Sequence, residues 1–167
     1  FLPYLMGIAT PHNDAAAAGS WIGLRQEHTP EVMLRSVLEG VAYNFRDSFE
    51  IFNCIPGLNV TQLLIGEGGA QSSVWPQIVA DVLGLDATIL SELNASAMGA
   101  AILAGVGSGY WSSFEEATNE VLIARDELAF DAERHERYDR LYEIYAKAYG
   151  KLREVFHDLS AVRTGEG

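Results

Sequence analysis

The sequence predicts a helix-rich α/β fold, and three patterns carry this prediction. An apolar run over residues 60–65 has the length and composition of a strand, and a glycine turn and a helical pattern follow it. A second short apolar run, over residues 87–90, also has the length of a strand. Apolar residues recur every three or four positions over residues 30–53 and 131–159, which predicts two long amphipathic helices.

The first 29 residues are predicted to be irregular, with turn chemistry at residues 10–14, Thr-Pro-His-Asn-Asp. His12 and Asp14 in this segment have two interpretations. They could face a cleft, or the Asp and Asn side chains could bind nearby backbone N–H groups of a turn. The sequence leaves both open.

The helix over residues 30–53 begins with Thr29 at the N-cap position and Pro30 at the first helical position. Arg35 and Glu39 lie one helical turn apart, so they can form an ion pair. A catalytic acid at Glu39 is the alternative.

The strand over residues 60–65 ends at residues 66–70, Gly-Glu-Gly-Gly-Ala. The three glycines allow positive φ angles and leave room above the backbone for a flat ligand. Either serine of Ser72-Ser73 can cap the next helix. Pro76 then falls in the first helical turn, where its missing N–H costs nothing, and Gly84 is placed to end the helix.

After the strand at residues 87–90, a helix of small residues is expected to begin near Ala95. Glycines at 105, 107 and 109 are expected to break the chain. Ser113 caps a short helix that is expected to run to about Ile123.

Asp131 is expected to start the last helix, and residues 161–167 are expected to form a frayed tail. Three tyrosines, at 138, 142 and 145, share the apolar stripe of this helix. We interpret them as core residues whose hydroxyls reach water, with ring stacking against a ligand as the alternative.

A strand, a glycine turn and a helix N-terminus together can hold an anion or a nucleotide. The dinucleotide fingerprint GxGxxG is not met, because Gly66-Glu67-Gly68 is followed by Gly69-Ala70-Gln71. The sequence also lacks the Gly-Lys-Ser/Thr of a Walker loop. On these residues alone, the turn is either a nucleotide site or a tight turn without a ligand.

The composition excludes several classes of function. The formal net charge of −12 argues against a nucleic-acid or anionic-membrane partner, since phosphate groups are bound by Lys and Arg. The sequence has no run of about 18 apolar residues that would span a bilayer. Cys54 is the only cysteine, which excludes an internal disulfide, fits the cytoplasm and predicts a buried side chain. The four histidines are scattered, so no metal site is predicted.

Several motifs, taken together, resemble the FGGY family of carbohydrate kinases. Residues 68–83, Gly-Gly-Ala-Gln-Ser-Ser-Val-Trp-Pro-Gln-Ile-Val-Ala-Asp-Val-Leu, are similar to the family's C-terminal signature. Residues 97–104, Ala-Met-Gly-Ala-Ala-Ile-Leu-Ala, are similar to the small-residue helix that follows the signature. Similarity to the xylulokinase branch lies in residues 1–5, residues 10–14, Gly23-Leu24 and residues 35–41.

The resemblance implies that residues 1–160 are an incomplete C-terminal, ATP-binding domain with the actin-like ATPase (ribonuclease H-like) fold. It implies an N-terminal sugar-binding domain upstream that supplies the catalytic aspartate, so this chain is expected to hold no catalytic residue and to be inactive alone. ATP with Mg²⁺ is the implied phosphoryl donor, and the resemblance also implies a cytoplasmic protein that forms a homodimer in the manner of its relatives.

In the resemblance, the glycine turn corresponds to the part of the domain that binds adenosine. Gly68, Gly69 and Ala70 are assigned to the face of the adenine and ribose, and Ser73 to a polar position near the adenine. Gln71 and Ser72 are further candidates. A side chain at residue 69 would occupy the space of the base.

Two departures from the family pattern matter. Glu67 stands where the family usually has the first glycine of a triplet, and we expect its side chain to point to solvent, with a ribose hydroxyl as the alternative. Ile8-Ala9 replaces a Glu-Arg pair that is common in xylulokinases, which leaves the sugar open. D-xylulose is the expected substrate, and ribulose, gluconate and glycerol are alternatives.

Two other classes of function also fit the residues. One is a non-catalytic nucleotide-binding or interaction module. The other is a helical scaffold whose glycines serve only as turns.

Overall fold

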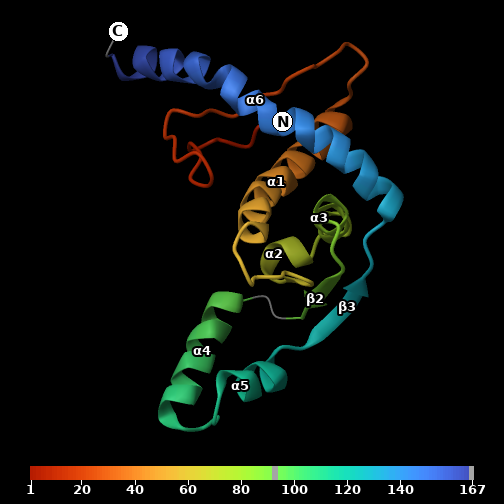
Figure 1. The fold of residues 1–167 in the computed structure, drawn as a ribbon, viewed down its shortest axis with the longest axis vertical. Helices are drawn as coiled ribbons and strands as arrows, with labels where there is room; N and C mark the ends of the chain where they lie inside the picture. Colours follow the sequence, from red (N-terminus) through yellow and green to blue (C-terminus); the bar gives the residue numbers. More distant parts are fainter. Residues whose placement is uncertain (92–93, 166–167) are drawn as a thin grey trace. The chain divides into compact units, whose positions relative to one another are not determined.

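The structure is a computed structural model that describes residues 1–91 and 94–165 (Figure 1). Residues 166 and 167, the end of the expected tail, lie outside the described residues. In chain order, the elements of the described part are α1 (Pro30–Asn53), β1 (Leu63–Ile65), α2 (Glu67–Ala70), α3 (Trp75–Leu83), β2 (Ala87–Leu90), α4 (Ala95–Ser108), α5 (Phe114–Val121), β3 (Ala124–Leu128) and α6 (Ala132–Thr164). This content confirms the predicted helix-rich α/β class.

The chain forms two compact units. Unit 1 contains Phe1–Val60, Asp81–Leu83 and the stretch that starts at Ala132. Unit 2 contains Thr61–Ala80 and Gly84–Asp131.

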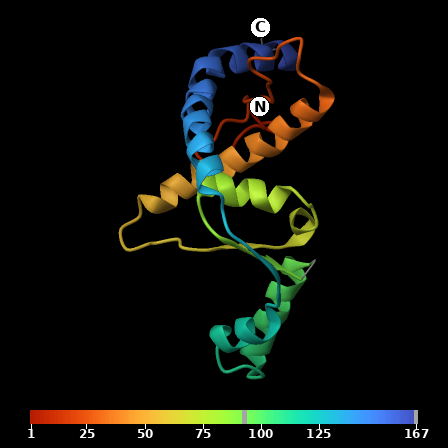
Figure 2. The same cartoon turned by 90° about the vertical axis from the view of Figure 1, so that its right-hand side faces the viewer.

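Unit 1 is built from α1, α6 and the irregular N-terminal segment, which lies against both helices (Figures 1 and 2). Its buried apolar side chains come from all three parts and include Leu2, Ile8, Ala42 and Phe156. Gly40 lets the N-terminal segment pack directly on the backbone of α1, since a Cβ built there would lie 2.3 Å from the carbonyl oxygen of Phe1. Burial of these faces stabilises the unit, at roughly 25 cal/mol for each Å² of apolar surface removed from water.

Tyr138 and Tyr145 of α6 lie in the core of unit 1, as predicted, whereas Tyr142 is only half-buried, and the hydroxyls of all three do not depend on water. Each hydroxyl forms a hydrogen bond inside the protein, which removes the cost of burying an unpaired polar group. The bonds join Tyr138 to Glu39 at 2.9 Å, Tyr142 to Asp47 at 2.8 Å and Tyr145 to Tyr4 at 3.1 Å. Arg35 and Glu39 form the predicted ion pair at 2.9 Å.

Arg46 of α1 connects three parts of unit 1. Its Nη1 donates to the Asp139 carboxylate of α6 at 2.5 Å and to the carbonyl oxygen of Val82 at 3.1 Å. The guanidinium also lies over the ring of Tyr142, 4.4 Å from its centroid, in a cation–π contact. One planar cation thereby fixes α1, α6 and the last residues of α3.

Asp14 is a turn residue whose second carboxylate oxygen reaches α6. Oδ1 accepts a hydrogen bond from the backbone N–H of Ala16 at 2.9 Å, as expected if the side chain stabilises a turn. Oδ2 accepts from the Tyr149 hydroxyl at 2.7 Å and lies 2.9 Å from His157 Nε2. The carboxylate is 9% exposed, and the hydrogen bonds from Tyr149 and His157 lower the pKa of Asp14 to about 2.

Unit 2 contains a three-stranded sheet in the order β1-β2-β3, parallel between β1 and β2 and antiparallel between β2 and β3. The central strand is buried, with Ala87 and Ile89 in the core beside Ile78 and Val79 of α3. β1 covers residues 63–65 rather than the predicted 60–65. β3, Ala-Arg-Asp-Glu-Leu, is mostly exposed and highly charged, which explains why its sequence gave no strand signal.

α4 continues through two of the three glycines that were expected to break the chain. The helix ends only at Gly109, which has a left-handed φ of 80°. At Gly105, a Cβ would lie 2.3 Å from the ring of Trp111, so the missing side chain makes room for that ring. The predicted cap at Ser113 is confirmed, since its side chain accepts from the N–H of Glu116 at 3.1 Å.

Two helix ends differ from the expectations. α6 continues through Thr164, so residues 161–164 of the expected tail are helical. Cys54 is exposed rather than buried, because α1 ends at Asn53 and the thiol lies beyond the packed face. Within the described ranges, no helix is long and apolar enough to cross a membrane.

We predict opposite effects for two alanine substitutions in α4. Gly105→Ala should lower the free energy of unfolding by about 1–3 kcal/mol, because the methyl group meets the Trp111 ring. Gly107→Ala should raise it by roughly 0.5–1 kcal/mol, because no described atom lies within 4 Å of the new Cβ and alanine favours helix. Urea unfolding of the two variants checks this, and equal effects would contradict the packing of Trp111 on α4.

The Asp14 carboxylate should make the stability of the protein depend on acid pH. Its pKa is lowered from 3.8 in the unfolded chain, so its contribution is complete above about pH 4 and is lost as the pH falls toward 2. Asp14→Asn should therefore reduce the free energy of unfolding by roughly 2 kcal/mol at pH 6 and by less at pH 3. Urea unfolding at both pH values tests this, and a difference that does not shrink at pH 3 would contradict it.

Candidate functional site

The glycine turn of unit 2 forms the short helix α2 between β1 and α3, and its glycines do not supply the positive φ that was expected. Gly66 has an extended φ of −124°. The left-handed residue is instead Glu67, with φ 59°. Because α2 is helical, Gly68 and Gly69 serve by lacking side chains rather than by adopting a conformation that only glycine tolerates.

The two glycines of α2 face different surroundings. A Cβ built on Gly68 would have no described atom within 4 Å apart from its chain neighbours and the backbone of its own helix, so this side of the turn is open. A Cβ on Gly69 would lie 3.0 Å from Cδ1 and Nε1 of Trp75. A side chain at residue 69 would therefore displace the Trp75 ring by a few tenths of an ångström, whether or not a ligand binds.

The remaining four candidate residues differ in how accessible they are. Ala70 is fully buried, and its carbonyl oxygen accepts a hydrogen bond from Arg125 Nη2 at 2.7 Å. Ser72 Oγ accepts from the backbone N–H of Trp75 at 3.1 Å, but the N-cap residue of α3 is Val74, so the prediction that a serine occupies this cap is wrong. Gln71 and Ser73 are exposed. Of the candidates, Gly68, Gln71 and Ser73 thus present the most accessible surface.

Glu67 is exposed, as expected, but its side chain also has a hydrogen-bond partner in the protein. Its carboxylate accepts a hydrogen bond from the backbone N–H of Ala95 at 2.6 Å. Ala95 is the first residue of α4, where backbone N–H groups lack partners within the helix. The side chain therefore connects the start of α2 to the start of α4.

A cavity of about 260 Å³ lies beside the two serines. β3 supplies one wall, from Arg125 to Leu128. The other lining residues are Ser72, Ser73, Pro76, Gln77 and Ile89. The contribution of β3 was missed because that strand itself was not predicted.

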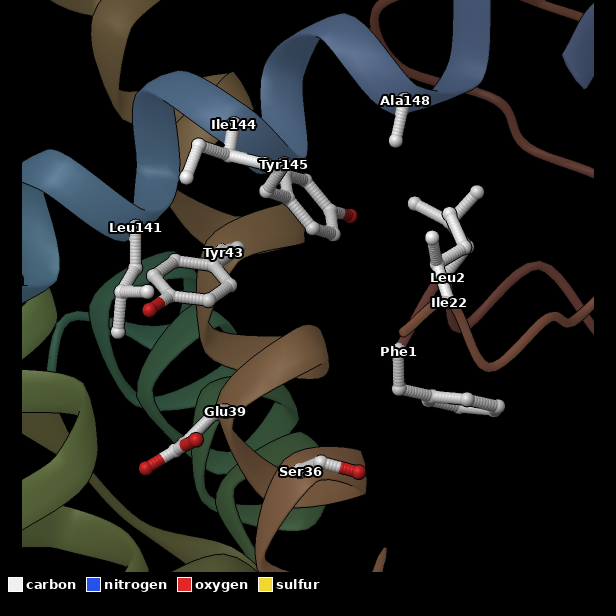
Figure 3. Close-up of a pocket in the computed structure, with 10 residues that line it drawn as sticks. All are labelled: Phe1, Leu2, Ile22, Ser36, Glu39, Tyr43, Leu141, Ile144, Tyr145 and Ala148. Carbon is white, nitrogen blue, oxygen red and sulfur yellow. The ribbon is translucent and has the colours of Figure 1, made fainter. Parts of the chain in front are cut away.

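A second cavity, of about 250 Å³, lies within unit 1 (Figure 3). Phe1, Leu2 and Ile22 of the N-terminal segment line one side, and residues of α1 and α6 line the other. Most of the lining side chains are apolar, and the polar ones include Ser36 and Glu39. Such a lining suits an apolar group better than a sugar with many hydroxyls.

Comparison with known proteins gives a consistent result. Residues 1–108 match the C-terminal domain of the FGGY family of carbohydrate kinases. A xylulose kinase of Staphylococcus epidermidis is 32% identical over 162 residues, which cover 97% of this chain and 32% of the relative. A glycerol kinase of Streptococcus agalactiae is 32% identical over 155 residues, covering 93% of this chain and 30% of the relative.

The fold is also similar to solved structures of these kinases. The crystal structure of xylulose kinase from Rhodospirillum rubrum is 33% identical, with a TM-score of 0.79, over 93% of this chain and 31% of that one. The chain thus spans about a third of the length of the relatives it matches. Its α/β units are part of the actin-like ATPase fold of these enzymes. The chain belongs to the FGGY family of carbohydrate kinases and carries its C-terminal domain.

Proposed function

We propose that the full-length protein containing this chain transfers a phosphoryl group from ATP to a sugar, and that this chain binds the adenosine. Membership of the FGGY family carries the proposal. The whole activity is expected to need a further domain, since the relatives are about three times as long.

The glycine turn fits a flat ligand on one side. The open face of Gly68 leaves the backbone accessible to the adenine and ribose, and the exposed Ser73 hydroxyl lies five residues further along the chain. Gly69 contributes to the shape of this surface by leaving room for the Trp75 ring. The side chain of Ala70 is buried, so only its backbone can contribute to the surface. Gln71 and Ser72 flank this surface, and Ser72 Oγ accepts a hydrogen bond from the backbone N–H of Trp75.

The chemistry of such a transfer is positioning and stabilisation of charge, and Mg²⁺, when bound together with the nucleotide, would neutralise part of the charge on the phosphates. The described residues contain no group of three or more His, Cys, Asp or Glu side chains arranged to hold a metal ion. We therefore assign to this chain the binding and orientation of adenosine. The catalytic aspartate is proposed to lie in an N-terminal domain that also binds most of the sugar.

D-xylulose is the proposed substrate, because xylulose kinases match nearly the whole chain. Glycerol is the second candidate, because a glycerol kinase is equally similar at 32% identity. A cytoplasmic location and a homodimer accompany the proposal as expectations from the family resemblance.

Release of ADP by the full-length protein tests the function directly. With Mg-ATP and a panel of D-xylulose, ribulose, gluconate and glycerol, we expect selective turnover of D-xylulose. Turnover of another compound in the panel would support the proposed kinase activity but show that the proposed substrate is wrong. If no member of a broad panel is turned over, the proposal of a sugar kinase is wrong.

Gly68→Val in the full-length protein tests the assigned adenosine surface. The variant should raise the KM for ATP by about tenfold or more, because its side chain fills the open face above α2. Gly69→Val should also impair the use of ATP, but its Cβ meets Trp75, so Gly68 gives the cleaner test. Gly107→Val is the matched control, since Gly107 also faces open space in a helix. An unchanged KM for ATP in Gly68→Val, with kinase activity intact, would refute the assignment.

A further inference from the structure

The four residues of α2, Glu-Gly-Gly-Ala, cannot hold a helical conformation by themselves. Helices shorter than about 12 residues are marginal in water, and each glycine costs roughly 1 kcal/mol relative to alanine. Two of the four residues are glycines. The conformation of the turn must therefore be imposed by groups outside it.

At the first residue of α2, the constraint comes from the Glu67 side chain. The backbone of Glu67 is in the left-handed region, φ 59°, which side-chain-bearing residues rarely adopt. The same residue accepts the N–H of Ala95 at 2.6 Å through its carboxylate. A charged acceptor at the first turn of α4 offsets the cost of that backbone conformation.

At the last residue of α2, the constraint comes from Arg125 on β3. Its Nη2 donates to the carbonyl oxygen of the fully buried Ala70 at 2.7 Å. In the β2–β3 register, Ile89 pairs with Asp126 and Leu90 pairs with Ala124. Arg125 therefore has no partner on β2 and is the additional residue of a β-bulge, a feature that redirects a side chain.

Arg125 also lines the 260 Å³ cavity together with Ser72 and Ser73. The arginine thus contacts the turn where α2 passes into the segment that carries the proposed adenine contact. Neither Glu67 nor Arg125 needs to touch a nucleotide in order to affect its binding.

We infer that Arg125 and Glu67 are positioning residues that hold the two ends of α2 and thereby pre-form the nucleotide-binding turn. The inference rests on the proposed function. Pre-forming a binding surface lowers the entropic cost of binding, so loss of either contact should weaken the affinity for nucleotide more than it slows the transfer step.

The test uses Arg125→Ala, Arg125→Lys, Glu67→Ala and Glu67→Gln in the full-length protein. Both alanine variants should raise the KM for ATP by about tenfold, with kcat and the KM for the sugar changed less than about twofold. Arg125→Lys keeps a donor and Glu67→Gln keeps an acceptor, so each should recover part of the loss. Arg25→Ala is the control, because this arginine is exposed and belongs to unit 1, which does not contain the turn.

Amide hydrogen exchange of a peptide covering residues 66–75 gives a second readout that does not need activity. Faster exchange in both alanine variants, together with the KM effect, supports the inference. Unchanged exchange, an unchanged KM for ATP in an active enzyme, or a parallel loss of kcat and both affinities would overturn it. If the wild-type protein phosphorylates no sugar, the proposed function fails, and exchange alone then decides whether the two residues hold the turn.

Discussion

The glycine-rich helix α2 depends on contacts made from other elements, and this constraint explains much of unit 2. The carboxylate of Glu67 holds its start through Ala95, and the guanidinium of Arg125 holds its end through Ala70. Trp75 packs against Gly69, so α3 is also fixed relative to the turn. The short charged strand β3 is thus more than the edge of a sheet, because its bulge brings the arginine to the turn.

Unit 1 follows a different principle, in which several buried polar groups are joined in hydrogen-bonded networks. Asp14 receives hydrogen bonds at both carboxylate oxygens, and Tyr145 pairs with Tyr4 across 141 positions of the sequence. Burial makes such groups costly when unpaired, so each network specifies one arrangement of α1, α6 and the N-terminal segment. The arrangement also leaves the apolar cavity shown in Figure 3.

Local signals in the sequence predicted the elements that have clear starts and stops. Pro30, Gly84 and Ser113 stand at the ends of helices as expected, and β2 has the predicted bounds. The features that could not be predicted depend on contacts between residues that lie far apart in the sequence. β3 carries charges rather than a strand pattern, and the hydroxyls of the tyrosines bind residues on other elements. The candidate site was located by its glycines, but Arg125, 55 positions after Ala70, gave no local signal.

A crystal structure of the full-length protein with Mg-ADP would show directly whether the glycine turn is the adenosine site. The adenine and ribose should lie against the open face of Gly68, with the Ser73 hydroxyl beside the base. Helix α2 should keep its conformation, with Arg125 bound to the Ala70 carbonyl. A nucleotide bound away from residues 68–73, or a turn that forms only around the ligand, would contradict these expectations.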